Sequence, residues 1–189
     1  MEILIGVISI LIAVLIALIP FFRRKYFLRP ELTVDIKSKG GGSSPLGLSG
    51  RNDFSKGAVD GRTALRIFEV TWRFEIRLTN NSDQIALYPE FDFNPNGRRF
   101  TKIDQLNKLE PIKPGETITL KAEYTKFEEK IGSERTHVGE GPPEELDDLN
   151  ILVTYQNQSK QAFFTLFDNS FSNDKNKFIR TKPQDFKIK

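Results

Sequence analysis

The sequence predicts an all-β fold, an antiparallel sandwich of about seven strands, preceded by one transmembrane α-helix. Three observations lead to this prediction. Residues 3–22 form an apolar run without a charged side chain. Several later segments alternate apolar and polar residues with a period of two, as half-buried strands do. After residue 30, no segment has convincing helical periodicity.

The composition limits the classes of protein to which the chain can belong. Once about thirty N-terminal residues are set aside, the rest of the 189-residue chain has the length of one domain. Charged residues make up 28% of the chain and both signs are mixed, so the net charge of +3 does not indicate a nucleic-acid partner. The absence of cysteine excludes disulfides and thiolate metal sites. The single histidine, His137, excludes a multi-histidine metal site within one chain.

The apolar run at residues 3–22 has the length of a membrane-spanning helix. Its twenty residues, at about 1.5 Å of rise each, match a hydrocarbon core of about 30 Å. A cleaved signal peptide is one alternative, but only Glu2 is charged before the run and no small-residue cleavage site follows it. A buried helix of a soluble fold is another, but the run has no amphipathic stripe. We therefore expect a retained anchor.

Four basic residues follow the apolar run, and no basic residue precedes it. Because positive charge is retained on the cytoplasmic side, we expect a single-pass protein of the inner or plasma membrane with a cytoplasmic C-terminal domain. In this orientation the glycosylation acceptor motifs at Asn80 and Asn157 are chance matches. The basic residues either bind anionic lipid at the membrane surface, for about 1 kcal/mol each, or act only as a topology signal. They are Arg23, Arg24, Lys25 and Arg29.

The chain is predicted to divide into two parts. Residues 1–30 form the transmembrane helix and a basic juxtamembrane linker, and residues 31–189 form the β-sandwich domain. The domain begins with a short alternating strand at 32–36. Seven glycines then predict a long mobile loop at 40–63, of the kind that is either functional or disordered.

The clearest strand signal lies at residues 68–79. Apolar side chains occupy every even position of this segment and polar side chains every odd position. Strict alternation over a dozen residues predicts a long strand with one buried face. A second strand is expected at 85–93, where Pro89 marks an edge or a bulge. A short strand is expected around 100–103.

The C-terminal half continues the pattern of strands and polar turns. A second long loop, which is acidic, is expected at 126–148. The basic tail from residue 173 favours disorder, with a last extended segment around 178–180 as the alternative. The strands predicted in this half lie at 118–124, after a Pro-Gly-Glu turn, and in a hairpin at 149–155 and 162–167.

Three stretches share a pattern that is typical of one kind of sandwich: FEIRLTNNSD, LEPIKPGETITLKAEY and ILVTYQNQSKQAFFTLF. A strand ends in an Asn/Ser/Asp turn, and a later Pro-Gly-Glu turn leads into a strand of alternating threonine. In this the chain resembles bacterial immunoglobulin-like β-sandwich domains over residues 31–168. The resemblance implies the fold alone, because these motifs carry no functional residues. The chain departs from antibody-type domains in its missing cysteine pair and its two long loops.

No catalytic residue, cofactor site or metal site is predicted. His137 lies between two glutamates and has the chemistry of a general base, but no nucleophile motif accompanies it, which favours a solvated loop histidine. The acidic loop lacks the spaced aspartates of a calcium loop. The glycine-rich loop lacks the lysine motif that cradles phosphate.

These observations favour a non-enzymatic interaction or scaffolding module: a single-span, membrane-anchored sandwich that faces the cytoplasm. Its expected partners are the lipid bilayer and a protein partner or second copy of the chain, with no nucleic acid and no cofactor. The alternative is a membrane effector of a bacterial stress or defence system, in which the sandwich senses a ligand or partner and the helix oligomerises. Ala13 and Ala17 give that helix a small-xxx-small pair. A hydrolase or nuclease is a third hypothesis, and it depends on His137.

Overall fold

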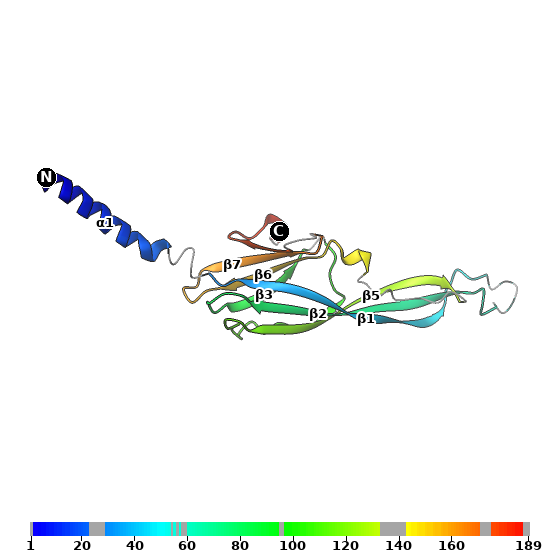
Figure 1. Ribbon diagram of the computed structural model, residues 1–189. Helices are drawn as coiled ribbons and strands as arrows, with labels where there is room; N and C mark the ends of the chain where they lie inside the picture. The colour runs from blue at the N-terminus through cyan, green and yellow to red at the C-terminus, as the bar shows by residue number, and fades with distance from the viewer. Residues whose placement is uncertain are drawn as a thin grey trace.

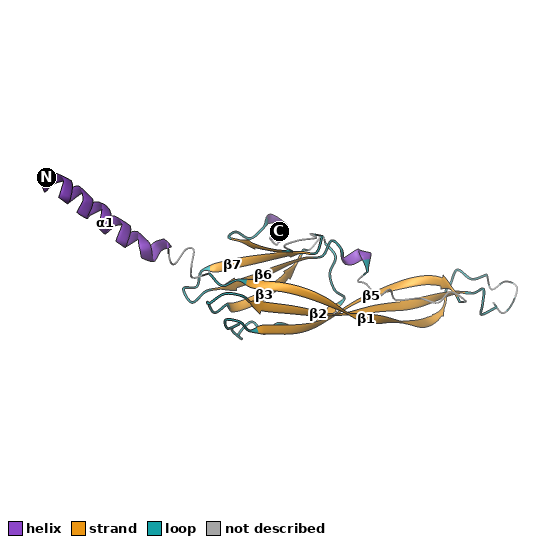
Figure 2. Ribbon diagram, viewed as in Figure 1, coloured by secondary structure: helices purple, strands orange, loops and turns teal. Residues whose placement is uncertain are grey.

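The computed structural model describes most of the chain, namely residues 2–22, 29–53, 55, 57, 60–94, 97–132, 143–170 and 175–186. Within the first helix, side chains are described from residue 8 to residue 20. Strands form about half of the described part (Figure 2). Three of the predicted membrane-surface residues, Arg23, Arg24 and Lys25, therefore lie outside the described residues.

Helix α1 (Glu2–Phe22) lies at the N-terminal end of the chain, and Figure 1 shows it standing apart from the strands. Its described apolar side chains are exposed, for example Ile10 at 68% and Ile16 at 61%. Within the described residues, no helix combines the length and the hydropathy that a membrane span requires. The transmembrane assignment therefore stays a prediction.

The described strands form two antiparallel sheets of four strands each, which confirms the prediction of an all-β sandwich. In the first sheet the strands lie in the order β1 (Leu32–Leu48), β2 (Leu65–Asn80), β5 (Thr117–Ile131) and β4 (Lys102–Ile103). In the second sheet the order is β3 (Leu87–Phe93), β6 (Asn150–Gln156), β7 (Ala162–Asp168) and β8 (Asn176–Ile179).

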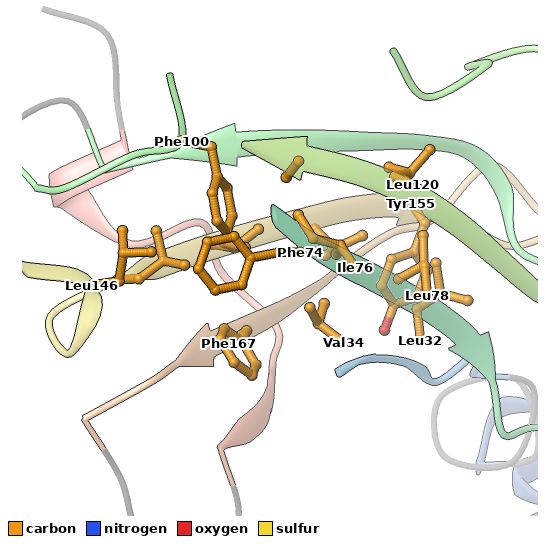
Figure 3. Close-up of a cluster of buried hydrophobic side chains, with 14 of the residues drawn as sticks. Leu32, Val34, Phe74, Ile76, Leu78, Phe100, Leu120, Leu146, Tyr155 and Phe167 are labelled. Atoms are coloured by element: carbon orange, nitrogen blue, oxygen red, sulfur yellow. The ribbon is translucent and has the colours of Figure 1, made fainter. Parts of the chain in front are cut away.

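The core lies between the two sheets, and the even residues of β2 form its centre (Figure 3). Ile76 and Leu78 are completely buried, and Phe74 is 3% exposed. Phe74 packs on Phe100 with ring centroids 5.3 Å apart. Because side chains alternate across a strand, the predicted period of two places every even residue of β2 on this face. Burial of a large apolar side chain contributes about 1.5–3 kcal/mol, so this face is the main source of stability.

Three strands extend beyond the sandwich as an arm, which we define as residues 41–48 of β1, 65–72 of β2 and 124–131 of β5 (Figure 1). The pairing of β2 with β5 continues without a register shift from Thr79 to Leu65. At about 3.3 Å per residue, the sixteen residues of β2 span about 50 Å. The arm therefore places its end far from the opposite end of the sandwich.

The arm corrects the loop boundaries predicted at 40–63 and 126–148, because β1 continues to Leu48 and β5 continues to Ile131. Glycine and serine have low β-propensity, which is why residues 40–48 have the composition of a loop. Their backbone groups nevertheless pair with β2, and Gly40 adopts a φ of 81° at the register shift between Ser38 and Gly41. Glycine adopts this conformation without steric cost.

The tail also differs from the prediction of disorder. Residues 176–179 form β8, in agreement with the alternative of a last extended segment, and a 3-10 turn (Gln184–Phe186) follows. Lys182 Nζ bonds Asp92 Oδ2 at 2.8 Å, and Phe186 is 6% exposed. The ion pair therefore attaches the tail to β3 of the second sheet, a contact that the basic composition of the tail does not reveal.

Asn80 ends β2 and bonds two neighbouring segments, 82–84 and 112–116. Its side chain is completely buried and donates to the carbonyls of Gln84 at 2.7 Å and Ile112 at 2.9 Å, while its Oδ1 accepts from Ser82 Oγ. Asn157 is 4% exposed, and its Oδ1 accepts from the Ser159 amide. The asparagines of both glycosylation motifs, Asn80 and Asn157, are therefore turn-forming residues that are inaccessible in the folded chain.

Replacing Asn80 with alanine should destabilise the sandwich by about 2–3 kcal/mol, because the four hydrogen bonds of its side chain, to Gln84, Ile112 and twice to Ser82, are lost. The free energy of unfolding of the full chain, from guanidinium titration, measures this. Asn81→Ala is the matched control, because Asn81 is exposed and its side-chain amide donates to the Thr33 hydroxyl at the surface. Equal destabilisation by the two variants would contradict the role assigned to Asn80.

Candidate interaction surfaces

The chain enters the sandwich through a basal joint made of Arg29, Phe163 and Phe178. The Arg29 guanidinium carbon lies 5.2 Å from the centroid of the Phe178 ring and 5.8 Å from that of Phe163. Its Nε and Nη2 are buried and make no hydrogen bond with the residues that the structure describes, and the two rings are close contacts of this cation, with the Tyr155 hydroxyl beside it. Burial raises the pKa of the Tyr155 hydroxyl, and its hydrogen bond with Thr165 and the nearby charge of Arg29 oppose that rise.

The basal joint contains one of the four predicted membrane-surface residues, Arg29. Arg23, Arg24 and Lys25 lie outside the described residues, whereas Arg29 packs on the sandwich. From Phe22 to Arg29 the chain can extend by at most about 25 Å. The end of the sandwich that carries the joint therefore lies within about 25 Å of the end of α1. Since β1 starts beside the joint and runs away from it, the arm is at the other end.

The end of the arm exposes apolar side chains among charged ones. Ser49 is 1% exposed and its hydroxyl donates to Glu129 Oε1 at 2.8 Å, while Arg51 Nη1 donates to Glu129 Oε2 at 3.1 Å. These bonds fix the start of the loop after β1 onto β5. Four large apolar side chains on the arm are more than a third exposed: Leu46 at 56%, Leu48 at 47%, Phe127 at 65% and Ile131 at 40%.

A group of four side chains attaches the short turn at Glu144–Leu146 to the arm. Lys126 Nζ lies 5.3 Å from the centroid of the Trp72 ring. The same ammonium bonds Glu128 and Glu145, each at 2.8 Å. Hydrogen bonds from Lys126 lower the pKa of both carboxyls, and the two carboxylates raise the pKa of Lys126. The cation is thus held between a ring and two carboxylates.

A cleft of about 370 Å³ opens between the edges of the two sheets. One wall is β3, and the other is the segment 103–108 that leaves the sheet after β4. The Glu90–Lys108 ion pair crosses between the walls. Backbone bonds between Ala86 and Ile112 join the two edges, at 2.9 and 3.0 Å. The apolar lining comes from Phe91, Phe93, Ile103 and Leu106, and the polar lining from Glu90, Asp104, Gln105 and Lys108.

Sequence reasoning did not find this cleft as a site. It did identify Pro89 as the mark of an edge or a bulge, and β3 is an edge strand whose register shifts between Leu87 and Glu90. Tyr88 has a φ of 52°, an uncommon conformation for a residue with a side chain. Pro89 was therefore the sequence signal for the irregular edge strand that forms one wall of the cleft. What the sequence could not show is that β4 has only two residues, which leaves the opposite wall unpaired.

The sequence contains three candidate chemical sites: His137, the acidic loop and the glycine-rich loop. His137 lies outside the described residues. The predicted acidic loop is divided between β5 and the turn at Glu144–Leu146, and in the described part of the chain no three acidic or histidine side chains form a metal-binding group. The first part of the glycine-rich loop, 40–48, is strand rather than a phosphate cradle.

Neither a protein-family model, nor a curated protein, nor a solved structure shows a significant match to the chain.

Replacing Lys126 with methionine should cost about 1 kcal/mol of unfolding free energy at pH 7, because two ion pairs and a ring contact are lost. A carboxyl with a lowered pKa stabilises the fold above its ordinary value of 4.5 and loses that contribution as the pH falls through the folded pKa. The difference between wild type and variant should therefore shrink below a pH of about 4. Urea titrations at several pH values measure it.

Lys130→Met is the control for this series, because Lys130 bonds Glu128 at 3.0 Å and has no described ring contact. Lys130→Met should lower the free energy of unfolding by less than Lys126→Met does. A Lys126→Met difference that stays constant from pH 7 to about pH 3 would show that the ion pairs contribute nothing to stability.

Proposed function

We propose that the chain is a single-pass membrane protein whose β-sandwich is a non-enzymatic interaction or scaffolding module on the cytoplasmic face. One observation carries the proposal: a helix that is uncharged from residue 3 to residue 22, with its described apolar side chains exposed, is joined by a short linker to a fixed end of a sandwich. Exposed apolar surface of this extent is unfavourable in water, and a bilayer removes that cost. The basic linker favours the cytoplasmic orientation.

The strand order supports a relation to immunoglobulin-like sandwiches. In the constant type of that fold, strands A, B, E and D form one sheet and C, F and G form the other. The chain has β1, β2, β5 and β4 in one sheet and β3, β6 and β7 in the other, with β8 added beside β7. Folds of this kind serve many functions, so the order supports the architecture and not a particular activity.

An interaction role is favoured by what the sandwich exposes. The arm presents apolar side chains about 50 Å from the basal joint, and the cleft opens between two sheet edges. Exposed apolar groups rimmed by polar ones are typical of surfaces that bind other proteins. The rival hypothesis, an effector that oligomerises through its helix, draws on Ala13 and Ala17, which stand four residues apart on α1.

The membrane anchor predicts that the chain stays in the membrane fraction after alkaline extraction. Introducing Leu11→Lys and Leu15→Lys together should release it, because each lysine near the centre of a span costs about 3 kcal/mol. Leu46→Lys with Leu48→Lys is the matched control, with the same two charges added on the arm. Release of the wild-type chain, or retention of the Leu11/Leu15 variant, would contradict the anchor.

Two further measurements test the orientation and separate the proposal from its rival. A reporter fused after Lys189 should be active only in the cytoplasm, and activity outside it would reverse the orientation. Exchange of α1 for an unrelated membrane helix should leave partner binding intact if the sandwich is the functional part. Loss of function on that exchange would instead favour the effector that acts through its helix.

A further inference from the structure

The two sides of the sandwich, where the edges of the sheets lie, differ in whether the backbone groups at the edge are hydrogen-bonded. On the side of β1 and β8, the Asn176 side chain accepts a hydrogen bond from the Val34 amide at 2.8 Å and donates one to the Val34 carbonyl at 2.9 Å. The side-chain amide thus occupies the place that a neighbouring strand would take. Natural proteins protect exposed strand edges by such devices, because an open edge pairs with other chains.

On the opposite side, the edge of β3 is open. The amide of Asn94 bonds the carbonyl of Asn150 in β6, so in this antiparallel ladder Asp92 and Glu90 also direct their backbone groups toward β6. The N–H and C=O groups of Phe91 and Phe93 therefore point away from β6. Among the residues that the structure describes, no hydrogen bond reaches these four groups.

The cleft lies directly beside this open edge. Its apolar lining is formed by Phe91 and Phe93 from β3, with Ile103 and Leu106 from the facing segment. Its volume of about 370 Å³ is in the range of sites that bury a ligand group. Open backbone groups together with an apolar pocket are the two components by which sheet edges bind extended peptides.

The charges of the cleft favour a basic partner. Glu90 and Asp104 are the two acidic residues of the lining, and Lys108 is the one basic residue of it. The Lys108 and Glu90 side chains are 61% and 44% exposed, so their ion pair is worth less than about 1 kcal/mol. An incoming Lys or Arg can therefore replace Lys108 at Glu90 at little cost and also approach Asp104.

We propose that an extended segment of a protein partner adds to the β3 edge as a further strand. It bonds the backbone of Phe91 and Phe93, inserts an apolar side chain into the cleft, and places a Lys or Arg beside Glu90 and Asp104. The segment is short, because the register shift at Leu87 and the buried Pro89 end the regular edge. This inference rests on the proposed interaction function and names the chemistry of its partner.

The test uses the full chain in lipid nanodiscs and two fluorescent heptapeptides that alternate threonine with leucine or valine. One peptide has lysine at both ends, and the other has glutamate at both ends. Fluorescence anisotropy should show micromolar binding of the lysine peptide, and binding of the glutamate peptide that is at least about tenfold weaker. Equal affinities, or no binding of the lysine peptide, would overturn the proposal.

Three variants locate the binding. Phe91→Pro removes an outward N–H without removing a bond to β6, and Leu106→Arg places a cation in the cleft from the facing segment, outside β3. Both should weaken the lysine peptide at least about tenfold. Leu109→Arg is the matched control, because Leu109 is 82% exposed and does not line the cleft. Wild-type binding by Phe91→Pro and Leu106→Arg would place the peptide elsewhere and overturn the proposal.

Capture of partners from the native cell distinguishes this inference from the function on which it rests. If Leu106→Arg retains a partner that the wild-type chain captures, the cleft is not the partner site and the interaction function stands. If the wild-type chain captures no partner, the interaction function itself fails.

Discussion

The continuous pairing of β2 is the constraint on which the rest of the structure depends. This strand pairs with β1 on one side and β5 on the other over nearly its full length, while its even side chains fill the core. A change of register by one residue would turn Ile76 and Leu78 to the solvent face. The core thus fixes the register, and the same register carries the three strands outward into the arm.

The sequence predicts the parts of the fold that side-chain alternation determines. The strand at 68–79, its Asn/Ser/Asp turn and the hairpin of β6 and β7 all agree with the structure because one of their faces is buried. The arm half of β1 was missed because its glycines and serines contribute backbone pairing and almost no side-chain signal. The order in the C-terminal tail was also missed, because it depends on distant partners: Asn176 of β8 bonds Val34, and Lys182 bonds Asp92.

The candidate sites were less predictable than the fold for a related reason. The basic linker could be read directly from the sequence, but the packing of Arg29 on Phe163 and Phe178 joins residues more than 130 positions apart. The cleft arises from the shortness of β4 and the irregular start of β3, which only the assembled sheets reveal. Asn176 closes one side of the sandwich, and the unpaired backbone of Phe91 and Phe93 makes the other side available. In our proposal this difference directs partner binding to the side away from β8.

Hydrogen–deuterium exchange along β2 in the full chain tests the central claim, that sandwich and arm are one continuous sheet. Amides at 65–71, in the arm, should exchange far more slowly than those of the exposed loop residues 60–62, because β2 is paired on both sides there. Their protection should approach that of residues 73–79 in the sandwich. Exchange at 65–71 as fast as in the loop would show that the arm is not formed and that β2 organises the sandwich alone.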